Sequence, residues 1–277
     1  MYEICSMAKQ VLTEPDPWAK AHMTHEFIGK WKKTQEPLVG KADIPDRPAR
    51  PEKPELRLPR DMPKRRKGGA VGTKIALLHA LAHIELNAID LAWDIMARFS
   101  PMSWQSVKDD EFELPKEFYD DWCQVVDDEA KHFLMLSDKL EELGSGYGAL
   151  PAHDGLWQSA ERTAHDFAAR LAIVPMVLEA RGLDVTPNMI KAMKDQGDND
   201  TSEILQLIHD EEITHVAAGT RWFRYWCEYY NKDIQSAWQE LVRTYFIGSL
   251  RGPFNNPSRL KAGMSLNWYE PLAEIMA

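Results

Sequence analysis

Apolar residues recur with a period near 3.6 along this 277-residue chain from Gly72 onward, the spacing that gathers them on one face of an α-helix. Turn-forming residues interrupt the pattern where helices are expected to end. The predicted helices span residues 73–99, 115–144, 155–181, 186–196, 201–230 and 233–250. No segment alternates with period 2 for long enough to predict a sheet. The pattern therefore predicts an all-α protein.

Four of the predicted helices are about 25 to 30 residues long, which favours an antiparallel four-helix bundle roughly 40 Å long with extra helices. Pro115 suits a first helical turn, and Gly182 is expected to cap the helix over 155–181. Pro175 lies inside that helix, where it removes one backbone hydrogen bond and is expected to kink it.

Residues 1–70 form a different region, an N-terminal segment followed by a Pro-rich basic arm, with the helical bundle over 71–277. Prolines are frequent between Pro37 and Pro63, so a helix is excluded through most of this stretch. The window 47–67 holds nine basic and three acidic residues, a net charge of +6. We expect the arm to lie along the acidic bundle, held by charge and by burial of Leu56 and Leu58. A docking surface for an anionic partner is the alternative.

Each long helix carries a glutamate on its apolar stripe. Glu85 shares a face with Leu78 and Ile89, and another glutamate directly follows the apolar run 171–178. An isolated buried carboxylate costs several kcal/mol, so four of them need compensation, for which cations are suited. The four are Glu85, Glu129, Glu179 and Glu212.

Two of these glutamates are followed three residues later by a histidine, as Glu129-x-x-His132 and Glu212-x-x-His215. This spacing puts a carboxylate and an imidazole on one helix face, where both can reach one metal ion. Four carboxylates and two imidazoles match the bundle pattern for two iron or manganese ions, whereas structural zinc prefers thiolates. The alternative is four buried glutamates neutralised by protonation or salt bridges.

Other polar residues have supporting roles in this interpretation. Asp128 and Glu211 each precede a predicted ligand, where either can orient a ligand imidazole through a hydrogen bond. His209 lies one turn before a predicted ligand, and we expect a role beside the metals or along an access path, or plain packing. His79 and His83 point away from Glu85 and are expected to pack elsewhere.

Composition and charge narrow the function classes. The formal net charge is −10, which makes the chain a poor non-specific binder of nucleic acid. The longest apolar run, 171–178, is far shorter than the roughly 20 residues that span a bilayer, so no membrane helix is expected. Three widely spaced cysteines predict no disulfide framework, and a cytoplasmic location is expected.

Several segments together resemble the bacterial ferritin-like family DUF455. They are 77–85 (LLHALAHIE), 179–187 (EARGLDVTP), 210–217 (DEEITHVA), 221–223 (RWF), 253–255 (PFN) and 262–263 (AG). The resemblance covers nearly the whole chain. It implies a ferritin-like fold with a dinuclear metal site whose ligands are the six residues named above, and it supplies no reaction. Related sites often have Asp where this chain has Glu211.

Three function classes follow. The first is an O₂- or peroxide-activating di-iron oxidoreductase acting on a small molecule, because a dinuclear site in an apolar bundle suits that chemistry. The others are iron handling or storage, and a non-catalytic interaction protein with a structural metal. A homodimer is a further possibility.

Overall fold

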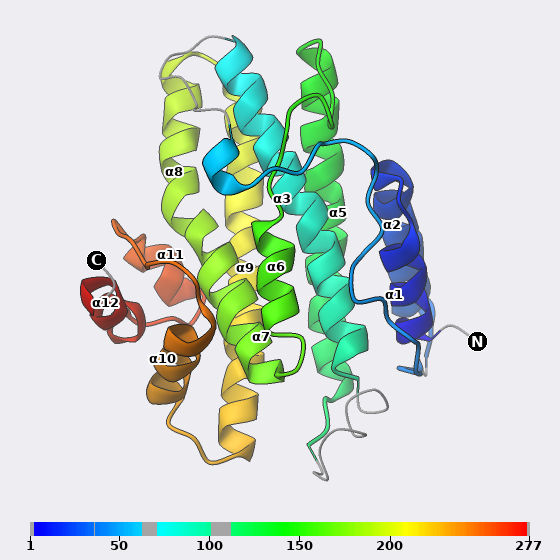
Figure 1. The fold of residues 1–277 in the computed structure, drawn as a ribbon, viewed down its shortest axis with the longest axis vertical. Helices are drawn as coiled ribbons and strands as arrows, with labels where there is room; N and C mark the ends of the chain where they lie inside the picture. The colour runs from blue at the N-terminus through cyan, green and yellow to red at the C-terminus, as the bar shows by residue number, and fades with distance from the viewer. Residues whose placement is uncertain (1–2, 36, 63–70, 101–111, 276–277) are drawn as a thin grey trace. The chain divides into compact units, whose positions relative to one another are not determined.

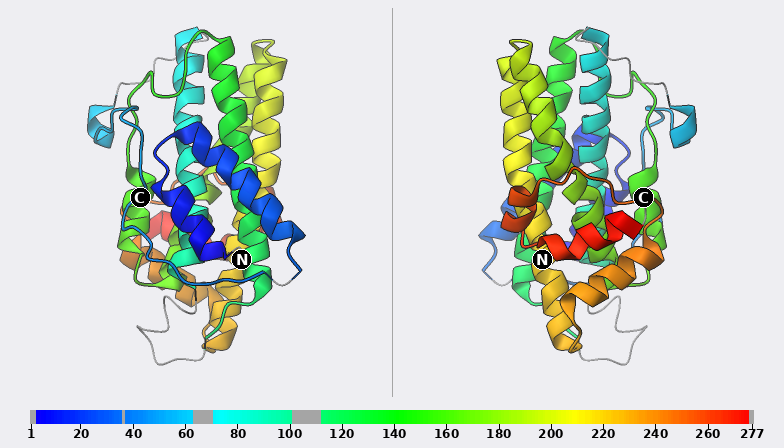
Figure 2. Two further views of the ribbon diagram at one scale, coloured as in Figure 1. Left: turned by 90° about the vertical axis from the view of Figure 1, so that its right-hand side faces the viewer. Right: turned by 90° about the vertical axis from the view of Figure 1, so that its left-hand side faces the viewer.

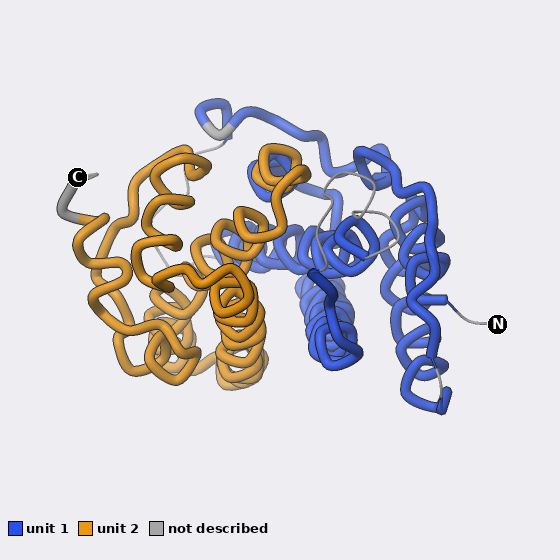
Figure 3. The backbone as a smooth tube through the Cα atoms, turned by 90° about the horizontal axis from the view of Figure 1, so that it is seen from below, with its two compact units in different colours: residues 1–158 blue, residues 159–277 orange. Residues whose placement is uncertain are grey.

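The structure, a computed structural model, describes residues 3–35, 37–62, 71–100 and 112–275 (Figure 1). These residues form helices and no sheet, with isolated β-bridges between Glu3 and Leu38 and between Leu56 and Ala152. The all-α prediction is thereby confirmed for the described part of the chain. The chain divides into two compact units, Met1–Gln158 (unit 1) and Ser159–Ala277 (unit 2), coloured separately in Figure 3. The proposed domain boundary at residue 70 stays a prediction.

Unit 1 is built around two long antiparallel helices, α3 and α5, which pack against each other (Figure 1). Helix α1 packs on α3 and α2 packs on α5, as Figure 2 shows from the side. The bounds are α1 (Ile4–Thr13), α2 (Pro17–Lys33), the 3₁₀ turn η1 (Pro59–Asp61), α3 (Val71–Arg98), α5 (Lys116–Glu142) and α6 (Gly155–Arg162), which contains the boundary.

Helices α3 and α5 confirm two of the predicted helices to within a few residues. Pro115 is the residue before the first turn of α5, and Gly144 adopts a positive φ of 73° just beyond its end. A Cβ makes that left-handed conformation costly, which is why a glycine stands there.

Helix α3 is also long and apolar enough to cross a membrane, by length and composition alone. Its best 18-residue window has a mean hydropathy of 1.4, and 67% of that window is buried inside the structure. A buried core helix gives the same signal, so this is weak evidence for a membrane span. His79, His83 and Glu85 interrupt the apolar residues of α3, so the helix contains no long unbroken apolar run.

Helices α1 and α2 were not predicted, although their signals are present in the sequence. Ile4, Ala8 and Val11 recur at helical spacing and are buried. Asp16 caps α2 by accepting a hydrogen bond from the backbone N–H of Ala19 at 2.7 Å. The predicted helices begin only at residue 73, so the N-terminal segment before the Pro-rich arm was assigned no secondary structure.

The described part of the Pro-rich arm, residues 37–62, belongs to unit 1. Backbone hydrogen bonds attach it, including Ala49 N–H to the carbonyl of Leu12 at 2.7 Å and Arg57 N–H to that of Ala152 at 2.8 Å. Basic side chains add ion pairs from Arg47 to Asp154 and from Arg50 to Asp90. Ion pairs thus join the described part of the arm to other residues of unit 1, while positions 63–67 lie outside the described residues.

The expected apolar anchors of the arm are wrong. Leu56 and Leu58 are 40% and 48% exposed, so neither attaches the arm by burial. Pro48 and Pro54 are buried instead. Proline has no backbone donor to leave unsatisfied, so burying its ring costs less than burying another residue of an irregular segment.

Unit 2 is built around α9, against which α7, the π-helical segment η2, α8, α10 and α11 pack. Helices α8 and α9 run antiparallel (Figure 1). The bounds are α7 (Phe167–Ile173), η2 (Val174–Glu179), α8 (Ala180–Asp195), α9 (Asn199–Tyr229), α10 (Ile234–Tyr245), α11 (Asn256–Lys261) and α12 (Leu266–Ile275). Helix α9 confirms the helix predicted over 201–230.

The single helix predicted over 155–181 begins where expected, with α6 at Gly155, but it is wrong in its middle and at its end. The chain turns at residues 163–166, where Asp166 accepts a hydrogen bond from Ala169 N–H and starts α7. Gly182 lies inside α8 and does not cap a helix. The separate helix predicted over 186–196 is therefore the second part of α8.

Two prolines explain the backbone of this region. Pro187 cannot donate to the carbonyl of Leu183, and the side-chain amide of Asn255 donates to that carbonyl instead, at 3.0 Å. The helix thereby continues through the proline. At Pro175 the predicted local disturbance takes the form of η2, whose wider turns end at Glu179.

The last predicted helix, over 233–250, is shorter than expected because α10 ends at Tyr245. Gly248 has a φ of 143°, a conformation outside the helical range. Helices α11 and α12 follow and were not predicted.

Candidate metal centre

Unit 1 gathers three of the predicted ligands inside its helix pair. Glu85 on α3 and Glu129 and His132 on α5 are each at most 3% exposed. The Nδ1 atom of His132 lies 3.3 Å from Oε2 of Glu85 and 3.6 Å from Oε2 of Glu129. One ligand atom from each of the three lies within 4.8 Å of the other two, close enough for a single ion.

Helix periodicity produces this arrangement. Glu129 and His132 are three residues apart on a regular helix, so their side chains leave the same face. Glu85 comes from an equally regular stretch of α3, whose flanking Leu86 and Ile89 are buried. No special backbone conformation is needed in this half.

The electrostatics of the unit 1 cluster favour a cation. Burial raises the pKa of Glu85 well above its usual range, and the nearby charge of Glu129 raises it further, while His132 opposes both effects. Two carboxylates in an apolar interior repel each other and resist ionisation until positive charge arrives. A divalent ion supplies that charge.

Unit 2 carries the other three predicted ligands. On α9, Nδ1 of His215 lies 3.8 Å from Oε1 of Glu212, and His215 is fully buried while the side chain of Glu212 is 12% exposed. Glu179, the last residue of η2, is half-buried. The helix η2 packs against α9 within this unit.

A glycine permits this close packing of η2 on α9. A Cβ placed on Gly219 would lie 2.5 Å from Cβ of Pro175 and 2.6 Å from its Cγ, distances that real Cβ atoms do not show. Gly219 is one helical turn after His215. Any larger residue there would push apart the two elements that carry Glu179 and His215.

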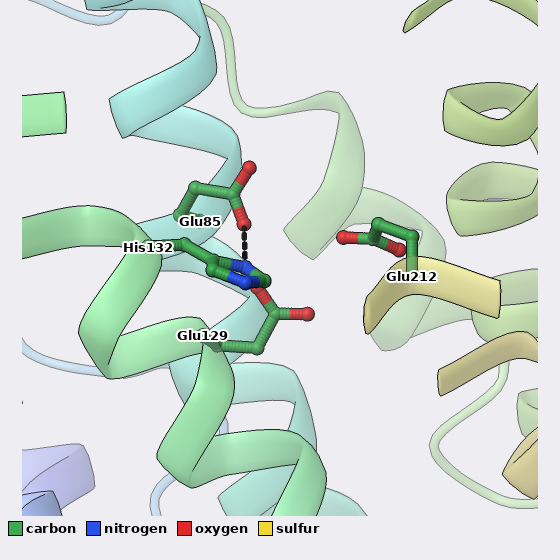
Figure 4. Close-up of side chains that lie close together, drawn as sticks. All are labelled: Glu85, Glu129, His132 and Glu212. Carbon is green, nitrogen blue, oxygen red and sulfur yellow. Dashed lines mark hydrogen bonds and ion pairs between the residues drawn. The ribbon is translucent and has the colours of Figure 1, made fainter. Parts of the chain in front are cut away.

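Within unit 1, Glu85, Glu129 and His132 form a group of Glu and His side chains that could hold a metal ion. Figure 4 draws these three together with Glu212 of α9 in unit 2, a fourth predicted ligand. Glu179 and His215 are outside that group. The donors of this group are carboxylates and an imidazole, without a thiolate.

The residues predicted to support the ligands have these surroundings. Asp128 is buried and accepts hydrogen bonds from Gln124 at 3.0 Å and Lys131 at 2.8 Å, both on α5. Glu211 is half-buried on α9. His209 is buried with Nε2 3.4 Å from the hydroxyl of Ser258, and burial lowers its pKa. Roles beside a metal ion stay predictions for all three.

His79 and His83 pack away from the cluster, within unit 1. Nε2 of His79 accepts a hydrogen bond from the N–H of Gly148 at 2.9 Å. His83 contacts the hydroxyl of Tyr147 at 2.8 Å, and burial lowers the pKa of this histidine to about 3. Both rings stack on Tyr147 and attach the loop after α5 to α3.

Sequence reasoning missed a buried ion pair that supports α8 directly after Glu179. The guanidinium of Arg259 on α11 donates to both oxygens of Asp184, at 2.9 and 2.7 Å. Asp184 also accepts the N–H of Asn255 at 2.9 Å. The segment 253–255 was noticed as part of a family resemblance, but nothing in its spacing pointed to Asp184.

Comparison with known proteins places the chain in a family. A curated relative from Haemophilus influenzae, described as an uncharacterized protein, is 38% identical over 221 residues, which cover 79% of this chain and 75% of the relative. None of the solved structures matches the chain. The family model described as protein of unknown function (DUF455) matches residues 13–270, and the chain belongs to that family.

Proposed function

We propose that the chain is a di-metal carboxylate protein that binds two iron or manganese ions in a ferritin-like four-helix bundle. The observation that carries the proposal is the repeated ligand pattern, a lone glutamate followed by Glu-x-x-His, which occurs once in each unit. In the proposed site Glu212 joins the cluster of Glu85, Glu129 and His132. Glu179 and His215 complete the set of six ligands.

The side chains have distinct tasks in this proposal. Four carboxylates would balance the charge of two divalent ions, and the two imidazoles would supply neutral nitrogen ligands. Phe133, Leu136 and Ile89 are buried along the same helices and keep water away from the carboxylates. Two such ions, when bound, can share the electrons needed to reduce O₂ or peroxide.

The proposed activity is therefore that of an O₂- or peroxide-activating oxidoreductase acting on a small molecule. A dry site protects an oxidising centre from side reactions with water, and the unit 1 ligands are almost completely buried. We also propose a reducing, cytoplasmic location, which agrees with three buried cysteines that form no disulfide.

Metal stoichiometry tests the proposal. The purified chain, loaded anaerobically with Fe(II) or Mn(II) and freed of excess metal, should contain close to two ions by elemental analysis. Glu129→Gln and Glu212→Gln should each lower this number, because each removes one charged ligand. Glu141→Gln is the matched control, since Glu141 is exposed on α5.

Exposure of the Fe(II)-loaded protein to O₂ then separates the function classes. Rapid oxidation that a small organic molecule accelerates over repeated turnovers supports an oxidoreductase. Accumulation of many ferric ions per chain would indicate storage instead. One zinc ion per chain, unaffected by Glu129→Gln and Glu212→Gln, would contradict the dinuclear site itself.

A further inference from the structure

A cavity of about 190 Å³ lies within unit 2, beside η2 and the start of α8. Glu179, Glu212 and His215 do not line it, so it is separate from the proposed metal ligands. Its volume corresponds to about six water molecules, which suits a ligand of roughly six to eight non-hydrogen atoms. The apolar part of its wall consists of Val177, Leu178, Phe246, Leu250 and Phe254.

The charged part of the wall has an excess of positive charge. Three arginines and one carboxylate line the cavity. Arg259 is 3% exposed, bonds both oxygens of Asp184, and stacks on Phe254 and Tyr269 with its guanidinium carbon 5.0 and 4.6 Å from the ring centres. The pair of Arg259 and Asp184 is therefore neutral and fixed in position. The positive charges of Arg181 and Arg251 are the net charge of the cavity wall.

These two arginines are held beside each other. Arg181 Nη1 donates to the backbone carbonyl of Arg251 at 2.8 Å, and Nε of Arg251 donates to the hydroxyl of Ser249 at 2.7 Å. Arg181 lies 3.9 Å from Asp184, whose oxygens are already occupied by Arg259, and Arg251 forms no ion pair within the described residues. Two partly exposed cations thus border an apolar hollow, with donors left for a ligand.

We propose that this cavity binds a small carboxylate with a short apolar tail. The carboxylate would accept hydrogen bonds from Arg181 and Arg251, since the planar guanidinium fork matches a carboxylate. The tail would lie on Leu178 and Leu250, where burial of apolar surface favours binding. A charged group without a tail would leave the apolar wall wet, and a tail without a charge would leave the arginines unmatched.

Because the cavity lies beside η2, we expect ligand binding there to be coupled to metal binding, an expectation that rests on the proposed function. Val177 and Leu178 are the two residues before Glu179, so a ligand in the cavity contacts the π-helical turn that positions that carboxylate. Ligand and metal would then alter each other's affinity by the same factor. The carboxylate ligand is in this sense a regulator or a recognised part of the substrate.

Calorimetric titration of the metal-free full-length chain tests the cavity independently of any metal. Hexanoate is the probe, hexanol lacks its charge, acetate lacks its tail and inorganic phosphate tests for a general anion site. Hexanoate should bind at least tenfold more tightly than each of the other three. Equal binding of phosphate or acetate would reveal only a cationic surface, equal binding of hexanol only an apolar one, and absence of hexanoate binding would refute the site.

Variants locate the binding. Arg181→Gln and Arg251→Gln should each weaken hexanoate about tenfold, the size of one lost charge-assisted hydrogen bond. Arg243→Gln is the matched control, because Arg243 is exposed on α10 and outside the cavity. If Arg181→Gln disturbs the helical circular dichroism, Arg251→Gln decides alone, since Arg251 lies in an exposed irregular segment. Unchanged affinity in that variant would overturn the proposal.

A last titration addresses the coupling. Mn(II) affinity is measured by electron paramagnetic resonance of the free ion. In the wild type it should change when hexanoate is added, whereas in Arg251→Gln the addition of hexanoate should leave it unchanged. Hexanoate binding without any effect on Mn(II) affinity would leave the cavity in place and refute the coupling. Failure to bind Mn(II) at all would instead contradict the proposed metal site.

Discussion

The two units present the same order of candidate ligands on very different backbones. In unit 1, Glu85, Glu129 and His132 project from two unbroken helices and are almost completely buried. In unit 2, Glu179 ends a π-helical segment and the side chain of Glu212 is 12% exposed. Regular helix periodicity is sufficient for the first arrangement. The second depends on individual contacts made by residues that are not ligands.

This difference implies that substitutions of residues that are not ligands should disturb the structure of unit 2 more than that of unit 1. Besides their apolar packing on α9, η2 and α8 depend on two specific contacts, a buried ion pair and a close approach at one glycine. Unit 1 has its ligands on helices held by broad apolar packing, where single contacts matter less.

The largest expected effect comes from breaking the buried ion pair. Arg259→Met leaves Asp184 buried without its principal partner and should lower the free energy of unfolding by about 3 to 5 kcal/mol. Urea denaturation followed by circular dichroism measures this. Lys191→Met is the control, because Lys191 forms an exposed ion pair with Asp195 on the same helix, α8, and should cost at most about 1 kcal/mol. Equal losses in the two variants would show that the buried pair does not hold α8.

A smaller loss is expected from Gly219→Ala. The new Cβ collides with Pro175, so η2 must move away from α9 at a cost of about 1 to 3 kcal/mol. Gly182→Ala is a matched control within α8, where an added Cβ meets no atom within 4 Å and should stabilise by about 0.5 to 1 kcal/mol. Opposite signs in urea denaturation would confirm the close approach. A stabilised Gly219→Ala would contradict it.

The long helices could be predicted because each gives its signal locally. Apolar periodicity and end signals located α3, α5 and α9 to within a few residues. The region from residue 155 to 196 could not be predicted in the same way. Gly182 indicated the end of one helix and Pro187 the start of another, although α8 continues through both. What overrides the signal at Pro187 is the amide of Asn255, which lies 72 residues away from Leu183 in sequence.

The candidate site shows the same division between local and distant information. A Glu-x-x-His spacing on an apolar stripe is visible in the sequence, and so is the lone Glu85. The ion pair of Arg259 with Asp184 was not, because the two residues are 75 positions apart and no periodicity links them. The prediction that Leu56 and Leu58 in the arm are buried was wrong for a related reason. Apolar character does not show which residues of an irregular segment face inward.

The unit 1 half-site can be tested without a metal ion. Burial and Glu129 raise the pKa of Glu85, so at neutral pH the metal-free protein must take up a proton there on folding, which costs stability. Glu85→Gln removes this cost and should raise the free energy of unfolding at neutral pH by about 1 kcal/mol. The same variant should gain less stability from Fe(II) than the wild type gains. Melting curves with and without anaerobic Fe(II) measure both effects, with Glu141→Gln as the control. Unfolding of the metal-free variant would identify Glu85 as a structural partner of His132.

The smallest effect concerns the arm of unit 1. Arg47 pairs with Asp154 at the surface, with 42% of the arginine side chain exposed, so Arg47→Gln should cost at most about 1 kcal/mol. The arm should stay in place, because Arg57 N–H and the N–H of Ala152 keep their backbone hydrogen bonds across the β-bridge. Limited trypsin digestion measures this at Arg57, since Arg47, Arg50 and Lys53 are each followed by a proline that blocks cleavage. Cleavage rates equal to those of the wild type are expected. Much faster cleavage in Arg47→Gln would mean that surface charge, and not the backbone, attaches the arm.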